Sequence, residues 1–173
     1  MGFLACFYPH EIQDSTYGIP FEDWYKKGYR GVIFDIDNTL VEHDAPADER
    51  SIALFDRLHS MGFETMLLSN NKEPRVKRFA KQVHSPYIYK AGKPKGKNYL
   101  AAMKQMRTDR DTTLFVGDQL FTDVWGAKRL GIYTILVKPI DKKEEIQIVL
   151  KRYLEKIVLH FYEKEQRRNR NGH

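Results

Sequence analysis

Residues 31–39 read GVIFDIDNT, and this stretch decides the fold. Its first residues are an apolar run with β-branched side chains, which predicts a buried strand. Asp35 and Asp37 then place two carboxylates at the strand end, and Thr39 adds a hydroxyl. Carboxylates this close repel each other unless a cation lies between them. Open parallel sheets bind ligands beyond the carboxyl ends of their strands, so the stretch predicts such a sheet with a site at this edge.

The rest of the chain alternates short apolar runs with amphipathic segments, a pattern typical of βαβ units around a mostly parallel sheet. We expect strands at residues 31–36, 64–69, 86–89, 112–117 and 133–137. We expect helices at residues 48–60, 73–82, 97–106 and 121–130, where apolar residues recur at spacings of three and four. The predicted fold class is therefore α/β, Rossmann-like and three-layered, with a mostly parallel five-stranded sheet.

Both ends of the chain differ from this pattern. The first thirty residues carry prolines and aromatic side chains without a period, so we expect no more than short helices there. A last helix is expected at residues 143–164, followed by the basic tail QRRNRNGH. One apolar stripe of that helix holds Ile146, Val149, Leu150, Tyr153, Leu154, Ile157, Val158 and Phe161. We expect a single domain over residues 1–173, with a core at about 28–140 and the helix and tail at 141–173.

The composition is that of a soluble globular protein, with 42% apolar and 30% charged residues among 173. Cys6 is the single cysteine, which excludes an intramolecular disulfide and suits a reducing compartment. No apolar run approaches the roughly 18 residues that span a bilayer. The formal charge of +6 favours anionic partners, yet no motif of aromatic and basic residues indicates nucleic acid binding. We therefore expect a cytoplasmic protein without a nucleic acid partner.

A second acidic cluster follows the fourth expected strand, in residues 112–123, TTLFVGDQLFTD. Gly117 permits a sharp exit from the strand, and Asp118 and Asp123 supply two further carboxylates. A hard divalent cation such as Mg²⁺ takes a few carboxylate oxygens and keeps water and substrate phosphate as its other ligands. The two clusters together predict a Mg²⁺ site, although Mn²⁺ could substitute.

Two other strand ends carry groups that suit a phosphoryl ligand. The second strand ends in LLSNN, where the Ser69 hydroxyl and nearby backbone N–H groups could hold a phosphate oxygen. The third is followed by AGKPKG, whose Lys93 could neutralise both a nucleophilic carboxylate and an incoming phosphoryl group. These residues predict a phosphoryl-transfer site.

Four stretches, FDIDNTL, LLSNN, AGKPKG and GDQLFTD, stand in this order at four strand ends. Over about residues 30–140 they resemble the four motifs of the haloacid dehalogenase superfamily of phosphatases. The resemblance implies that Asp35 is the nucleophile and Asp37 the general acid and base, an acid that dehalogenase, phosphonatase and phosphate-pump relatives would lack. It implies phosphate binding by Thr39, Ser69, Asn70 and Lys93, and metal binding by Asp35, the Asp37 backbone carbonyl, Asp118 and Asp123.

This superfamily often carries cap domains just after the first motif or between the second and third motifs, and both intervals are short here. The sequence therefore predicts an open site without a cap, which could accept a head group that belongs to a large substrate. Nearly the whole chain resembles the bacterial subgroup IIIA phosphatases related to phosphatidylglycerophosphate phosphatase. GDQLFTDVWGAKRLGIYTILVKPI is one of the stretches that carry this resemblance. It implies removal of the terminal phosphate from phosphatidylglycerophosphate, whose anionic phospholipid head group would be the substrate, to give phosphatidylglycerol. A phosphatase of soluble sugar or nucleotide monophosphates and a non-enzymatic binding protein are the alternatives.

The apolar stripe of the last helix has several interpretations. It could pack on its own domain or on a second copy in a homodimer, and this is the interpretation that we favour. It could also settle against anionic lipid, because Arg167, Arg168 and Arg170 follow it. In that case the protein would lie peripherally at the inner face of the cell membrane.

Overall fold

The computed structural model describes residues 3–141 and 146–171. Six strands form one sheet in the order β1-β6-β5-β2-β3-β4, and every neighbouring pair is parallel. The strands are β1 (Glu11–Gln13), β2 (Gly31–Phe34), β3 (Glu64–Leu68), β4 (Tyr87–Ile88), β5 (Thr113–Gly117) and β6 (Tyr133–Val137). The order reverses between β2 and β5, where such sheets bind ligands.

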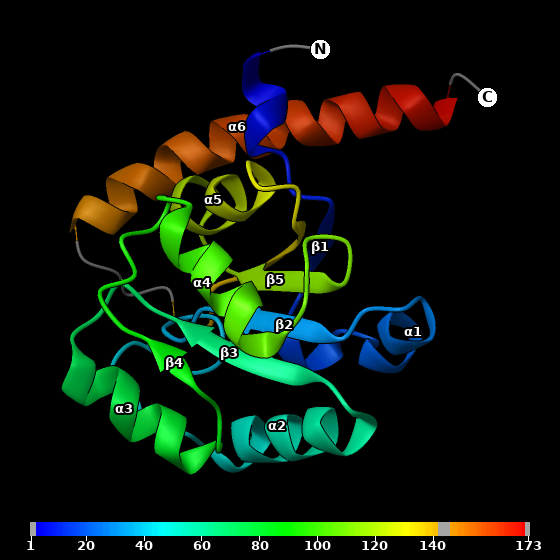
Figure 1. Cartoon of the computed structure of the whole chain (residues 1–173). Helices are drawn as coiled ribbons and strands as arrows, with labels where there is room; N and C mark the ends of the chain where they lie inside the picture. Colours follow the sequence, from blue (N-terminus) through cyan, green and yellow to red (C-terminus); the bar gives the residue numbers. More distant parts are fainter. Residues whose placement is uncertain (1–2, 142–145, 172–173) are drawn as a thin grey trace.

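Helices cover both faces of the sheet, and Figure 1 shows α1, α2 and α3 on one side and α4, α5 and α6 on the other. The α-helices are α1 (Phe21–Lys26), α2 (Glu49–Met61), α3 (Glu73–Gln82), α4 (Lys97–Met106), α5 (Trp125–Lys128) and α6 (Ile146–Asn171). Short helical turns are η1 (Phe3–Phe7), η2 (Thr16–Gly18) and the π-helical η3 (Leu120–Val124). The result is the predicted three-layer α/β fold.

Strand β2 shows why the sheet is buried on both faces. Val32 and Phe34 pack with Phe55 of α2 in one core, whereas Ile33 packs with Tyr99 of α4 in the other. Successive side chains of a strand point to opposite faces, so an unbroken apolar run fits a strand that has helices on both sides. The apolar run thus fixes β2 in the middle of the sheet.

All five predicted strands are present, with end shifts of at most two residues, but a sixth strand was missed. Strand β1 lies in the N-terminal stretch for which only short helices were expected, and it pairs with β6 at the sheet edge. Its three residues are too few to show a period, and Ile12 is 37% exposed. This strand therefore depends on its pairing with β6, and its own hydrophobic pattern does not indicate a strand.

Three of the four predicted inner helices match α2, α3 and α4 closely. Helix α2 begins after Asp48, whose carboxylate accepts the Ser51 N–H at 2.8 Å, and it ends at Gly62 with φ of 90°. The fourth, at residues 121–130, is divided into the π-helical turn η3 and the short α5. Single π-helical turns often mark functional sites, and this one carries Asp123.

Helix α6 overturns one part of the favoured interpretation, the packing of the whole apolar stripe on its own domain, while packing on a second copy stays a prediction. The predicted residues 143–145 lie outside the described part, as do the side chains of Ile146, Val149 and Leu150. Of the rest, only Val158 is buried, and the others are exposed: Tyr153 by 67%, Leu154 by 50%, Ile157 by 46% and Phe161 by 46%. The polar residue Glu155 is buried against the domain instead, because it bonds to η3. Among the described residues, no helix has the length and apolar character needed to cross a bilayer.

Candidate active site

A cavity of about 280 Å³ opens at the carboxyl ends of β2, β3 and β5. It is lined by Asp35, Asp37, Asn38, His43, Ser69, Asn70, Asn71, Lys93, Gln119 and Thr122. Five of the eight predicted site residues therefore share one cavity. Thr39, Asp118 and Asp123 lie beside it and are fully buried.

Lys93 lies between two carboxylates at the base of this cavity. Its Nζ donates to Asp35 Oδ1 at 2.5 Å and lies 2.7 Å from Asp123 Oδ1. Burial by itself lowers the pKa of Lys93, but Asp123 and Asp35 outweigh burial and raise the pKa above its ordinary value. Burial raises the pKa of Asp35 to about 8, and Lys93 opposes that rise. The ammonium thus stays charged and stabilises the anionic form of Asp35.

Asp118 is enclosed by two donors. Thr39 Oγ1 donates to Asp118 Oδ1 at 3.1 Å, and the Arg152 guanidinium of α6 contacts the other carboxylate oxygen. Burial raises the pKa of Asp118 to about 7, although Arg152 opposes the rise. Thr39, which the sequence predicts to bind phosphate, donates its hydroxyl to this carboxylate and is not among the residues that line the cavity, so its phosphate contact stays a prediction.

Asp35, Asp118 and Asp123 form a set of oxygen ligands that fits a divalent metal ion. One carboxylate oxygen from each lies within 4.8 Å of the others, and all three residues are buried. Lys93 and Arg152 supply two positive charges beside these three carboxylates, which leaves negative charge for a hard cation, and hard cations prefer oxygen ligands. Gly117 makes the approach of Asp123 possible, since a Cβ at position 117 would lie 2.5 Å from Asp123 Oδ2. The Asp37 carboxylate is not part of this set.

Asn70 holds the main chain of Lys93. Asn70 Oδ1 accepts the Lys93 N–H at 2.8 Å, and its amide group donates to the Lys93 carbonyl at 3.4 Å. The neighbouring Ser69 hydroxyl accepts the Asn71 N–H at 3.1 Å and also lines the cavity. The end of β3 therefore fixes the loop that carries the lysine.

Three residues that contact the site from outside the cavity lining were not predicted from the sequence. Arg75 of α3 donates to Asp37 Oδ1 at 3.0 Å and is only 7% exposed. Arg152 and Glu155 of α6 contact the loop after β5. A buried arginine within the basic run KEPRVKR has no distinguishing local signal, because its partner lies 38 residues earlier.

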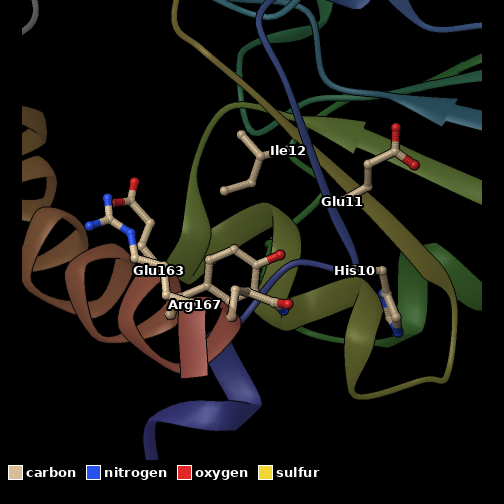
Figure 2. A pocket seen from close by; sticks show the side chains of 7 residues that line it. His10, Glu11, Ile12, Glu163 and Arg167 are labelled. Atoms are coloured by element: carbon tan, nitrogen blue, oxygen red, sulfur yellow. The ribbon is translucent and has the colours of Figure 1, made fainter. Parts of the chain in front are cut away.

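A larger cavity, about 460 Å³, lies elsewhere. Figure 2 shows it between α6, which carries Glu163 and Arg167, and the segment with His10, Glu11 and Ile12. None of the predicted site residues lines it. We therefore take the smaller cavity as the candidate active site, because of the residues that line it and its position at the strand ends, and not because of its size.

A buried group of three carboxylates and one lysine, at the carboxyl edge of a parallel sheet, is an arrangement for handling a phosphoryl group beside a divalent cation. The chain belongs to the haloacid dehalogenase-like hydrolase family, whose model matches residues 41–131. The matched range includes Ser69, Lys93, Asp118 and Asp123, whereas Asp35 and Asp37 precede it.

Two relatives agree with this family, and one solved structure shares the fold. The chain is 38% identical to "Probable phosphatase YqeG" of Bacillus subtilis, over 88% of this chain and 90% of that protein. It is 28% identical to phosphatidylglycerophosphate phosphatase 1 of Arabidopsis thaliana, over 82% of this chain but only 43% of that protein. The cobalt-bound deoxy-D-mannose-octulosonate 8-phosphate phosphatase of Haemophilus influenzae has a TM-score of 0.54 at 17% identity, covering 64% of this chain and 69% of that one. The last likeness concerns the fold, and together the family and the first relative make this chain a phosphatase.

Proposed function

We propose that the protein is a Mg²⁺-dependent phosphomonoester hydrolase that forms an aspartyl-phosphate on Asp35 and acts on phosphatidylglycerophosphate. The observation that carries the chemistry is the 2.5 Å contact of Lys93 Nζ with Asp35 Oδ1 inside the buried acidic group. The lipid substrate is supported by the similarity to the plant enzyme, of which this chain spans less than half.

In the first chemical step a carboxylate oxygen of Asp35 attacks phosphorus in line. The bond between Asp35 and phosphorus forms as the bond from phosphorus to the leaving alkoxide breaks. Lys93 is placed to stabilise the negative charge on the phosphoryl oxygens, while Ser69 and Asn70 border the space that these oxygens would occupy. Asp37 gives the departing alkoxide its proton.

The contacts of Asp37 indicate which of its oxygens holds that proton. Oδ1 accepts from Arg75 at 3.0 Å and from the Asp44 N–H at 2.9 Å. Oδ2 has a 3.4 Å contact with the Asn71 amide. Oδ2 is therefore the oxygen we assign to proton transfer. In the second step the same oxygen takes a proton from the water that attacks the aspartyl-phosphate, which releases phosphate and restores Asp35.

Asp35, Asp118 and Asp123 are the side chains that would hold Mg²⁺. The bound ion would neutralise charge that gathers on the phosphoryl group during transfer. Thr39 keeps Asp118 oriented by its 3.1 Å hydrogen bond.

The surroundings of the cavity favour a substrate with a large body. Only residues 35–48 lie between β2 and α2, and only α3 and its connections lie between β3 and β4. Neither interval contains a cap domain, so the site is open to a head group presented at a surface. A lipid phosphatase of this kind would work in the cytoplasm at the inner face of the membrane.

The direct test measures phosphate release by the purified protein with Mg²⁺. Phosphatidylglycerophosphate in mixed micelles is compared with a panel of soluble sugar and nucleotide monophosphates, and Asp35→Asn is the control. We expect the highest kcat/KM for the lipid. A preference for a soluble ester would overturn the lipid assignment, and an absence of metal-dependent release from any ester would overturn the enzymatic function itself.

A further inference from the structure

The outward side of α6 exposes four large apolar side chains on three successive turns. Tyr153 is 67% exposed, Leu154 50%, and Ile157 and Phe161 46% each. Spacings of three and four residues place them on one side of the helix, opposite the buried Glu155. In Figure 1, α6 lies on the outer side of the layer that covers this face of the sheet, where it contacts η1 and η3. Contiguous apolar surface of this kind marks a site of interaction.

Two basic residues, Lys164 and Arg168, follow the exposed apolar residues on the same side of the helix. Lys164 follows Phe161 at a spacing of three, Arg168 follows Lys164 at a spacing of four, and both are exposed. Glu165, next to Lys164 in the sequence, interacts with the Tyr8 hydroxyl, where burial and this carboxylate together raise the pKa of Tyr8. The face therefore combines an apolar part with a cationic part, which is the pattern of a helix that lies in the interface of an anionic bilayer.

We infer that this outward face of α6, made of Tyr153, Leu154, Ile157, Phe161, Lys164 and Arg168, docks on an anionic lipid surface. A second copy of the chain is the less suitable occupant, because the same face would offer Lys164 and Arg168 no acidic partner. The inference rests on the proposed function, since a lipid substrate presents such a surface.

The docking face begins beside the catalytic cavity. Arg152, which immediately precedes Tyr153, contacts the carboxylate of Asp118. A helix lying along the lipid surface would therefore bring the carboxyl edge of the sheet close to that surface. The arrangement lets the open cavity receive a head group while the lipid body stays in the bilayer.

Vesicle sedimentation of the full-length protein tests the docking face without requiring activity. Vesicles of phosphatidylcholine with phosphatidylglycerol are compared with pure phosphatidylcholine vesicles, at low and high salt. We expect binding to the anionic vesicles alone, weakened at least about 10-fold by Lys164→Glu/Arg168→Glu. Leu154→Ser/Ile157→Ser should also weaken it. Lys77→Glu/Lys81→Glu on α3 changes the net charge equally at two exposed positions and should leave binding within about twofold.

The outcomes separate docking from substrate choice. Equal loss of binding in the α3 control, or equal binding to neutral vesicles, would overturn the docking face. The docking face would also be overturned if the wild type did not bind vesicles but formed a concentration-dependent dimer, and if Leu154→Ser/Ile157→Ser dissociated that dimer. Binding to vesicles without hydrolysis of phosphatidylglycerophosphate would overturn the proposed substrate and support the docking face. Hydrolysis of a soluble ester should be unchanged in all these variants, because none of their residues lines the cavity.

The inward side of the same helix supports a second inference, from different contacts. Glu155 Oε1 accepts the Leu120 N–H at 2.8 Å, and Glu155 is 4% exposed. Arg152 donates to Glu155 Oε2 at 3.0 Å and also to the carbonyl and the carboxylate of Asp118. Two side chains of α6 thus hold the start and the end of the loop from Asp118 to Leu120.

We propose that Arg152 and Glu155 are positioning residues that orient Asp118 for the metal ion. Outer partners of metal ligands commonly change metal affinity by about 10- to 100-fold. Arg152→Met and Glu155→Gln should therefore weaken Mg²⁺ binding in calorimetry by about 10-fold or more. They should lower kcat on a soluble ester while KM changes little. Lys156→Met, at an exposed position of α6, should behave like the wild type in both measurements.

Circular dichroism and a thermal melt establish that each variant is folded, and Arg152→Lys, which keeps a charge, should recover part of the Mg²⁺ affinity. Unchanged Mg²⁺ affinity in folded Arg152→Met and Glu155→Gln would overturn the positioning role. Tighter Mg²⁺ binding in Arg152→Met would overturn it as well, because Arg152 would then be a competitor of the metal ion.

Discussion

Arg75 donates to Asp37 Oδ1 at 3.0 Å, although the two residues lie on different elements and Arg75 is almost fully buried. The guanidinium contacts one oxygen of Asp37, and the other oxygen lies 3.4 Å from the amide of Asn71, which lines the cavity. Arg75→Met removes this restraint, and misplacement of a catalytic group by about 1 Å can cost about 100-fold in rate. We expect kcat to fall by about that factor with a small change in KM. Steady-state kinetics on a soluble ester measure both.

The matched control for Arg75 is Arg78→Met, which removes an exposed arginine from the same helix. It should leave kcat within about twofold of the wild type. Equal kcat in Arg75→Met and in the wild type would contradict the role of Arg75.

The strand ends could be predicted from the sequence because their signal is local. Apolar runs that stop at Asp35, Ser69 and Asp118 define buried strands and place polar groups at one edge of the sheet. Parallel strands then bring those groups together without further information. For this reason, the sequence could predict that several carboxylate side chains gather around Lys93.

The side of α6 that packs on its own domain could not be predicted from the hydrophobic period, because the structure buries a side other than most of the apolar stripe. Most described apolar side chains of its stripe are exposed, while Glu155 is buried. Contacts of Arg152 and Glu155 with a loop 34 and 35 residues earlier decide which side faces the domain. A local pattern contains no information on such partners. Strand β1 was missed for the same kind of reason, since its pairing partner β6 lies far along the chain.

Replacing the proposed nucleophile, Asp35, should abolish turnover and preserve the fold. Asp35→Asn keeps the shape of the side chain but removes the negative charge that attacks phosphorus. We expect phosphate release to fall below detection, at least about 10⁴-fold. The far-ultraviolet circular dichroism spectrum should match that of the wild type. Trapping with a fluoride analogue of the phosphoryl group should label the wild-type site only, and substantial residual hydrolysis by the pure variant would remove the assignment of Asp35.

Lys93→Met should affect both rate and stability. The variant leaves Asp35 and Asp123 buried without their shared ammonium, and breaking a buried ion pair typically costs about 3 kcal/mol or more. We expect a lower free energy of unfolding in urea and no measurable turnover. Because Mg²⁺ supplies positive charge to the same carboxylates, the stability deficit should be smaller with Mg²⁺ than with chelator. Lys95→Met, two residues away and exposed, is the control, and a stability deficit as large in Lys95→Met would argue against the charge explanation.

The metal-free protein should lose stability as the pH rises. Burial raises the pKa of Asp35 from 3.8 to about 8 and that of Asp118 from 3.8 to about 7. In the unfolded chain both carboxyls ionise near 3.8, so between that pH and about 8 the folded state binds more protons. The free energy of unfolding therefore decreases through this window in the presence of chelator, and thermal melts at pH 5, 6, 7 and 8 measure the decrease.

Mg²⁺ should oppose this loss of stability. A divalent ion binds the ionised carboxylates of the folded state, so the stabilisation by a fixed Mg²⁺ concentration should grow from pH 5 to pH 8. Asp35→Asn removes one of the two carboxyls whose pKa is raised. It should therefore make the stability of the protein in chelator depend less on pH. If the melting temperature of the chelated wild type rises over this range, or if Asp35→Asn has the same slope, the buried carboxyls are not the groups that couple folding to protons and metal.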